Sequence, residues 1–291
     1  MSTVSSTPPL RGDSAPTLPS VDASAPQRAG TDFPGRARIG ERTLRTDRWW
    51  LQPLVTVTVL GIFILYTGVR IFMRDYYWVE EYSYLTPLFS PCLSDSCAPG
   101  SSHLGTPLPE LPFFIPLPFL IFPILAGFRA TCYYYRKAYY RSFWLSPPAC
   151  AVAEPHTRYS GETRFPLLVQ NAHRYFFFAA SLLLLINTYD AILAFFPDTG
   201  FGIGLGSLIL VANVALLWGY SLSCHSCRHI TGGRLKHFSK HPLRYKAWTI
   251  ISKLNARHMQ FAWISLVSVM VTDLYILAVS AGWISDLRIV G

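Results

Sequence analysis

Five long apolar stretches recur along the chain, each separated from the next by a polar or charged segment. A helix needs about 20 mainly apolar residues, at a rise of about 1.5 Å per residue, to cross a hydrocarbon core about 30 Å thick. All five stretches reach that length, so the pattern predicts an all-α, polytopic membrane helix bundle with five transmembrane helices. The predicted spans are residues 49–72, 111–131, 172–196, 203–223 and 259–284.

The predicted span over 111–131 differs from the others because prolines interrupt it at positions 112, 116, 118 and 123. Proline lacks the backbone N–H that a helix interior uses. Protein neighbours would therefore have to satisfy the carbonyls that these prolines leave free within the membrane.

Residues 1–48 are rich in Pro, Ser, Thr, Ala and Arg and contain almost no large apolar side chains. Such a segment cannot bury enough apolar surface to offset the entropy of ordering. We interpret it as a disordered cytoplasmic tail that precedes a five-helix transmembrane domain at 49–291. It lacks the basic, apolar and small-residue order of a cleaved signal peptide, so the first span is predicted to stay in the membrane.

The composition and the charge pattern support this interpretation. Charged residues make up 14% of the chain, against about 25% in soluble domains. Of the 25 Lys and Arg residues, 22 fall in three segments, 1–48, 129–174 and 228–257, which five spans place on one side. The positive-inside rule then predicts a multi-pass plasma-membrane protein with cytoplasmic basic loops, the N-terminus inside and the C-terminus outside. No basic stripe remains outside these loops to indicate nucleic-acid binding.

The predicted topology separates the six cysteines by depth. Cys92 and Cys97 lie in the outer loop, where an oxidising compartment favours a local disulfide. The other four lie near the cytoplasmic ends of the spans, and so do several histidines. Thiols and imidazoles from different helices can therefore meet at this depth although they are far apart in sequence.

These thiols and imidazoles could together form a metal site. Cys224 and Cys227 are three residues apart and share a helix face, whereas His225 and His229 face roughly the opposite side. A metal held by both cysteines must therefore take further ligands from other helices. The predicted ligands are Cys224, Cys227, His173 and His258, with Cys132, His225 and His229 as reserves. Two thiolates and two imidazoles suit structural zinc or a [2Fe-2S] cluster with mixed ligation.

Alternative interpretations of the same residues remain open. Small buried cysteines are common in helices, and histidines at a membrane interface often bond only to water or a carbonyl. His173 and His258 could instead clamp a b-type haem between adjacent helices. Cys224 and Cys227 could form the redox pair of a thiol-disulfide oxidoreductase, although a reducing cytoplasm opposes this. A zinc-stapled scaffold without catalytic activity is a further alternative.

Three other features have a structural and a functional interpretation. Gly200, Gly202, Gly204 and Gly206 predict close helix packing, because no strand precedes them as a nucleotide-binding loop requires. The aromatic and basic residues at 133–144 predict an interfacial belt, with a docking face for a cytoplasmic subunit as the alternative. The intramembrane carboxylates Asp190 and Asp273 lie towards the outer surface, where they are either helix-end acids or proton carriers.

Four segments carry a resemblance to a known family. They are residues 84–92 (Tyr-Leu-Thr-Pro-Leu-Phe-Ser-Pro-Cys), 131–150 (from Thr-Cys-Tyr-Tyr-Tyr-Arg-Lys to Ser-Pro-Pro-Ala-Cys), 223–229 (Ser-Cys-His-Ser-Cys-Arg-His) and 253–258 (Lys-Leu-Asn-Ala-Arg-His). Together they resemble the membrane anchor subunit of actinobacterial succinate dehydrogenase, over about residues 48–290. The resemblance implies a trimeric complex II with flavoprotein and iron–sulfur subunits on the cytoplasmic face. It also implies a haem-free anchor with a Rieske-type [2Fe-2S] cluster that reduces menaquinone.

The chain is predicted to act only as part of that oxidoreductase. It contains no flavin or dinucleotide fingerprint and no ferredoxin-like run of cysteines, so it cannot oxidise succinate alone. Quinone carbonyls need hydrogen-bond donors near the cytoplasmic depth. The candidate quinone-binding residues are Arg129, Tyr133, His229 and Trp263.

Overall fold

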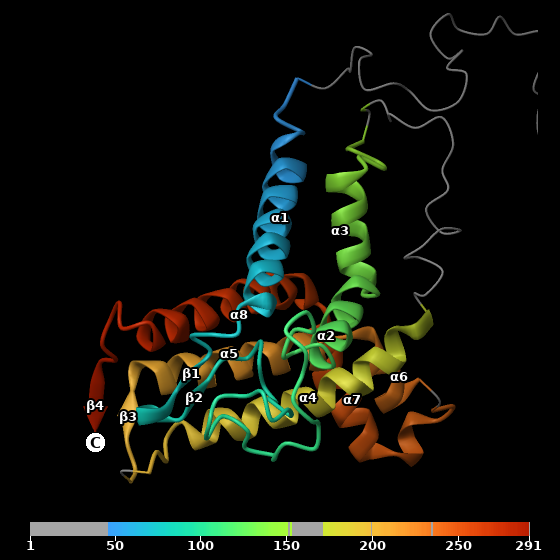
Figure 1. Cartoon of the computed structure of the whole chain (residues 1–291). Helices are drawn as coiled ribbons and strands as arrows, with labels where there is room; N and C mark the ends of the chain where they lie inside the picture. Colours follow the sequence, from blue (N-terminus) through green and yellow to red (C-terminus); the bar gives the residue numbers. More distant parts are fainter. Residues whose placement is uncertain (1–45, 151, 153–170, 199, 234, 291) are drawn as a thin grey trace, which may run out of the picture. The chain divides into compact units, whose positions relative to one another are not determined.

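A computed structural model describes residues 46–150, 152, 171–198, 200–233 and 235–290, and the structural statements below concern these residues. The tail predicted over 1–48 lies outside them, apart from its last three residues. The described part is mostly helical, as predicted (Figure 1). Its helices are α1 (Leu51–Phe72), α2 (Ile121–Ala130), α3 (Tyr133–Phe143), α4 (His173–Leu193), α5 (Leu205–Leu222), α6 (His225–Gly232), α7 (Pro242–Asn255) and α8 (His258–Ser280).

Four of these helices, α1, α4, α5 and α8, are long and apolar enough to cross a membrane. They coincide with four of the predicted spans to within four residues at each end. α5 packs against α4 and α8, and α1 packs against α8 and α3 (Figure 1). Large apolar side chains point outward from them, such as Leu182 with 61% of its surface exposed. This arrangement fits a multi-pass membrane protein whose outer faces contact lipid.

Polar side chains occupy the interfaces between the long helices. Ser268 on α8 donates to the Asn213 side chain on α5 at 2.6 Å. Trp218 on α5 donates to the Thr188 hydroxyl on α4 at 3.0 Å. Helices in a membrane gain no hydrophobic advantage from meeting each other, so such interhelical hydrogen bonds contribute to their association.

The predicted span over 111–131 does not form a membrane-length helix. Only α2 is helical there, and its 10 residues extend about 15 Å at about 1.5 Å per residue. The preceding residues form successive turns closed by the carbonyls of Pro112, Pro116 and Pro118. Pro123 is tolerated because it lies in the first turn of α2, where its missing N–H has no helical partner to lose. The prolines thus limit the helix to the second half of the predicted span.

This segment nevertheless passes from one end of the bundle to the other. Ser90 hydrogen-bonds Asp190 near the C-terminal end of α4. Thr131, at the end of α2, contacts His173 at the start of the same helix. The chain between these points therefore traverses the length of α4, mainly as turns and one short helix.

The segment between α1 and α2 is folded and cross-linked. Strands β1 (Trp78–Val79) and β2 (Tyr84–Leu85) pair antiparallel, and the 3-10 turn η1 (Glu80–Tyr82) connects them. The predicted disulfide between Cys92 and Cys97 is confirmed, with the two sulfurs 2.01 Å apart.

Glycines allow close contacts at the start of α5, although their partners are a strand and the C-terminal segment rather than the helix that the sequence predicted. Strands β3 (Ile203–Gly204) and β4 (Arg288–Val290) pair there as a second antiparallel ribbon. A Cβ atom on Gly206 would lie 2.3 Å from the Tyr84 ring, and one on Gly204 would lie 2.0 Å from the Asp286 carboxylate. The absence of side chains thus lets the loop and the C-terminal segment pack against α5. The remaining short element, η4 (Phe238–Lys240), precedes α7.

Candidate metal centre

Two cysteines and two histidines lie at helix ends that converge at one end of the bundle. Cys132 follows α2 and is the N-cap residue of α3, and Cys224 follows α5 and is the N-cap residue of α6. His173 and His258 are the first residues of α4 and α8. All four side chains line one cavity of about 740 Å³. The helix junctions therefore direct two thiols and two imidazoles into a common space.

Each imidazole faces a thiol from a different part of the chain. His173 Nε2 lies 3.0 Å from Cys224 Sγ, and His258 Nε2 lies 3.4 Å from Cys132 Sγ. Both cysteines are almost fully buried. Within the described ranges, no three His, Cys, Asp or Glu side chains already surround one point as metal ligands. The structure thus brings the donors together as two pairs beside a shared cavity.

Nδ1 of each imidazole contacts the hydroxyl of the residue that directly precedes one of these cysteines. Thr131 Oγ1 lies 2.9 Å from His173 Nδ1. Ser223 Oγ lies 2.7 Å from His258 Nδ1. The contacts form a closed ring. Thr131 contacts His173, and the neighbouring Cys132 faces His258. Ser223 contacts His258, and the neighbouring Cys224 faces His173. The ring runs through Thr131, His173, Cys224, Ser223, His258 and Cys132.

An aromatic ring stacks on each imidazole. Phe128 lies parallel to His173 with ring centroids 5.1 Å apart, and Tyr220 lies parallel to His258 at 5.1 Å. Each aromatic residue precedes its hydroxyl residue by three positions. The pattern aromatic-x-x-Thr/Ser-Cys therefore occurs twice, at 128–132 and 220–224, and each copy fixes one histidine by a ring contact and a hydrogen bond.

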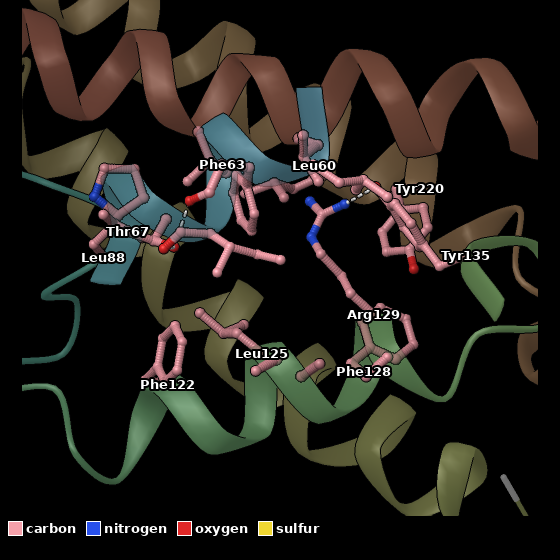
Figure 2. A pocket seen from close by; sticks show the side chains of 18 of the residues that line it. Leu60, Phe63, Thr67, Leu88, Phe122, Leu125, Phe128, Arg129, Tyr135 and Tyr220 are labelled. Carbon is pink, nitrogen blue, oxygen red and sulfur yellow. Dashed lines mark hydrogen bonds between the residues drawn. The ribbon is translucent and has the colours of Figure 1, made fainter. Parts of the chain in front are cut away.

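A second, apolar cavity adjoins this centre. It has a volume of about 590 Å³ and is lined by residues of α1, α2, α3, α4, α5 and α8. Figure 2 shows Leu60 and Phe63 of α1 opposite Phe122 and Leu125 of α2 across the cavity. Phe128 and Tyr220 also line it. The two rings that stack on the imidazoles are thus shared between the centre and the cavity.

Arg129 supplies the positive charge of the apolar cavity. Its side chain extends from α2 into the cavity (Figure 2). The guanidinium donates to the Tyr135 hydroxyl at 2.5 Å and to Ser265 Oγ at 3.2 Å. It also lies 4.8 Å from the centroid of the Tyr220 ring. Of the four residues predicted to bind quinone, Arg129 is the one that lines this cavity.

The remaining predicted quinone residues lie elsewhere. Tyr133 lines the Cys and His cavity, with 58% of its surface exposed. Trp263 donates its indole N–H to the Tyr134 hydroxyl at 2.5 Å. His229 is exposed on α6, where its ring would contact any side chain added at Gly233.

Of the four predicted metal ligands, three line the Cys and His cavity and Cys227 does not. Cys227 is buried in the apolar core and is not among the residues that line the Cys and His cavity. Cys132, a reserve in the sequence-based prediction, lies there instead. His225 also lines the cavity, but its side chain is exposed.

The intramembrane carboxylates lie at the other end of the bundle and are paired. Asp273 forms an ion pair with Arg70, with 2.7 Å between Oδ2 and Nε. Thr86 and Tyr66 also donate to this carboxylate. Asp190 accepts from Ser90, and its other oxygen lies 2.8 Å from His103 Nδ1. Both acids therefore connect the segment between α1 and α2 to the long helices.

Comparisons with known proteins agree with this architecture. A family model described as actinobacterial succinate dehydrogenase subunit SdhC matches residues 51–282. The solved Mycobacterium smegmatis Sdh1 complex in the apo form contains a chain that is 64% identical to this one, with a TM-score of 0.82. That match covers 88% of this chain and 97% of that chain. The search of curated proteins found no match.

The chain belongs to the actinobacterial succinate dehydrogenase subunit SdhC family. It is therefore a membrane-anchor subunit of a succinate dehydrogenase, as the resemblance implied. The family match includes both copies of the aromatic-x-x-Thr/Ser-Cys pattern. The depth of each Cys and its i, i+3 spacing, on which the sequence prediction rested, do not reveal this repeated pattern. Comparing the residues that precede Cys132 and Cys224 would have revealed it.

Proposed function

We propose that this subunit passes electrons from a soluble iron–sulfur subunit to menaquinone by way of a Rieske-type [2Fe-2S] cluster. The proposed ligands are Cys132, Cys224, His173 and His258. The proposal rests chiefly on one observation, namely the ring in which two thiols and two imidazoles line a cavity beside an apolar pocket. The cluster, when bound, would accept and release single electrons.

The chemistry of the donor set fits this group. A Rieske-type cluster takes two Cys on one iron and two His on the other. Both thiols here are buried, and both imidazoles offer Nε2 on the side of the sulfurs. The backbone N–H of Ser226 also donates to Cys224 Sγ at 3.4 Å. Such outer hydrogen bonds orient ligands and tune a metal centre.

The residues between the two cavities would couple the centre to quinone. Phe128 and Tyr220 contact the imidazoles on one side of this boundary and line the apolar cavity as well. A quinone head group in that cavity would lie one ring layer from a histidine. Arg129 could donate a hydrogen bond to its carbonyl and stabilise negative charge on the oxygen during reduction.

The proposed partners are the flavoprotein and iron–sulfur subunits of succinate dehydrogenase. Membership of the SdhC family supports this assembly. The same end of the bundle carries α3, where Arg136 and Lys137 lie beside exposed Tyr133. This basic and aromatic surface is adjacent to the Cys and His cavity. We propose that it faces the cytoplasm and contacts the iron–sulfur subunit.

The thiol-disulfide alternative is disfavoured by the burial of its cysteines. Burial raises the pKa of the Cys224 thiol to about 12 and also raises the pKa of Cys227. Redox-active cysteines instead need a lowered pKa, because the thiolate is the nucleophile. Both thiols would be protonated at neutral pH. A bound metal would favour the thiolate form of Cys224.

The haem and zinc alternatives differ in measurable ways. A haem held by His173 and His258 would need both Nε2 atoms, and each now faces a sulfur. It would give a sharp Soret band. Zinc would bind the same four donors but would give no electron paramagnetic resonance signal. Metal analysis therefore separates structural zinc from iron.

The test compares single Cys→Ser variants in the purified complex. Cys132→Ser and Cys224→Ser should remove the dithionite-reduced, low-average-g [2Fe-2S] signal and menaquinone reduction. Cys227→Ser is the matched control, since Cys227 is also buried but does not line the cavity. It should keep the signal. Loss of the signal in Cys227→Ser, with retention in Cys132→Ser, would contradict the proposed ligand set.

A further inference from the structure

The hydroxyl of Thr131 has only one proton, and two neighbours lie within reach of it. Its Oγ1 lies 2.6 Å from the carbonyl oxygen of Gly127 and 2.9 Å from His173 Nδ1. Two oxygens 2.6 Å apart would repel each other without a proton between them. The Thr131 proton is therefore donated to Gly127. The remaining contact requires His173 Nδ1–H to donate to Thr131.

Ser223 repeats this arrangement at the other histidine. Its Oγ donates to the carbonyl oxygen of Tyr220 at 2.9 Å. The same oxygen lies 2.7 Å from His258 Nδ1. By the same reasoning, Ser223 accepts from His258 Nδ1–H. Both hydroxyls thus act as acceptors towards an imidazole.

We infer that Thr131 and Ser223 are positioning residues that hold both imidazoles as the Nδ1–H tautomer and leave Nε2 as the metal-binding atom. This inference rests on the proposed function and specifies the ligand atoms of the same centre. A neutral histidine has one protonated nitrogen and one lone pair, and the partner of the first decides which nitrogen can bind metal. Each Nε2 here faces a thiol across the cavity.

Aromatic stacking and the hydroxyl together restrict other orientations of each imidazole. A 180° flip of an imidazole about its Cβ–Cγ bond would exchange Nδ1 with Cδ2 and Nε2 with Cε1 while keeping the ring contact. For His173 this flip would turn a carbon towards Thr131, and the Nδ1–H would lose its acceptor. The planes of Phe128 and His173 are only 9° apart, so rotation out of the plane would break the stack. The hydroxyl therefore opposes the 180° flip of the imidazole, and the stacked aromatic ring opposes its rotation out of the plane.

Site-specific isotope labelling of histidine tests the inference directly. The whole complex is prepared with ¹⁵N at Nδ1 in one sample and at Nε2 in another. Pulsed electron paramagnetic resonance of the reduced cluster then shows which nitrogen couples strongly to iron. We expect strong coupling from the Nε2 label and only weak, remote coupling from the Nδ1 label. Strong coupling from Nδ1 would overturn the inference while leaving the proposed cluster in place. Absence of any [2Fe-2S] signal would overturn both.

Hydroxyl variants provide a second test that does not depend on activity. Thr131→Val and Ser223→Ala should each lower iron affinity by about 10- to 100-fold in a chelator challenge, as loss of an outer-shell partner does. Thr131→Ser and Ser223→Thr keep the acceptor and should retain iron. Ser142→Ala is the matched control, because Ser142 is also buried and bonds a helix carbonyl but contacts no histidine. Equal iron retention in Thr131→Val, Ser223→Ala and this control would overturn the positioning role.

Discussion

The ring of Tyr220 lies parallel to the imidazole of His258, with centroids 5.1 Å apart and an angle of 11° between the planes. Tyr220 also lines the apolar cavity, and its hydroxyl finds no hydrogen-bond partner within the described part of the chain. One side chain therefore belongs to both the metal centre and the cavity. Its aromatic ring and its hydroxyl can be tested separately.

Replacing Tyr220 tests whether the ring is the part that matters for the centre. Tyr220→Phe keeps the stacking ring and removes a buried hydroxyl that bonds to nothing in the described structure, so iron content should not fall. Tyr220→Leu removes the stack and should destabilise the complex by about 1–3 kcal/mol. Iron content and thermal unfolding of the purified complex measure both effects. Equal loss in the two variants would show that the hydroxyl, rather than the ring, supports the centre.

Replacing Arg129 tests the assignment of the apolar cavity to quinone. A hydrogen bond to a charged group contributes about 1.5–3 kcal/mol, so Arg129→Gln should raise the KM for menaquinone by about 10- to 150-fold. Succinate oxidation with a soluble artificial acceptor should change little. Arg74→Gln is a suitable control, because Arg74 bonds backbone carbonyls near Pro112, outside both cavities. An unchanged KM in Arg129→Gln would place the quinone elsewhere.

Apolar run length made the four long helices predictable, but it could not determine the secondary structure of 111–131. Run length reports whether a segment can be buried in lipid, not whether its backbone is helical. The prolines there divide the segment into turns and α2, and the neighbouring segments supply the remaining contacts. The overall helical architecture therefore follows from sequence, whereas this irregular crossing depends on tertiary packing.

The prediction of which cysteines lie beside the histidines was limited because it used only helical spacing and depth in the membrane. Helical spacing places Cys224 and Cys227 on one face only if a single helix contains both. The chain instead leaves α5 at Ser223 and starts α6 after Cys224, whose backbone is extended. Because of this break, the Cys224 and Cys227 side chains do not share one helix face. Depth alone placed Cys132, His173 and His258 at one end of the bundle, where the structure also has them, but it could not show which cysteines line the cavity.

Close packing at Gly206 predicts a steric effect of an added methyl group. A Cβ atom there would lie 2.3 Å from the Tyr84 ring, so Gly206→Ala should cost about 1–3 kcal/mol, as overpacking does. Gly61→Ala is the matched control in α1, since no atom lies within 4 Å of its added Cβ. It should be neutral or slightly stabilising, because alanine favours helix. Thermal unfolding of the two variants checks the difference, and equal melting temperatures would contradict the contact.

The buried pair of Arg70 and Asp273 predicts an asymmetry between single and double variants. Their side chains are 2% and 0% exposed, so Arg70→Met leaves an unpaired carboxylate and should cost about 3–5 kcal/mol. The double variant Arg70→Met, Asp273→Leu removes both charges and should recover much of this loss. Unfolding of the purified complex measures both. A double variant no more stable than Arg70→Met would show that the charge pair is not the source of the loss.

The sidedness of the bundle is a prediction that cysteine labelling in intact cells can test. The basic loops are predicted to be cytoplasmic, which places the Cys92–Cys97 disulfide outside and α7 inside. After mild reduction, a membrane-impermeant maleimide should label Cys97, which is partly exposed, in intact cells. Lys246→Cys introduces a thiol at an exposed position on α7, and it should react only after the membrane is permeabilised. The parent chain, treated identically, corrects for the native cysteines. Labelling of Lys246→Cys in intact cells would reverse the proposed orientation and move the Cys and His centre away from the cytoplasmic subunits.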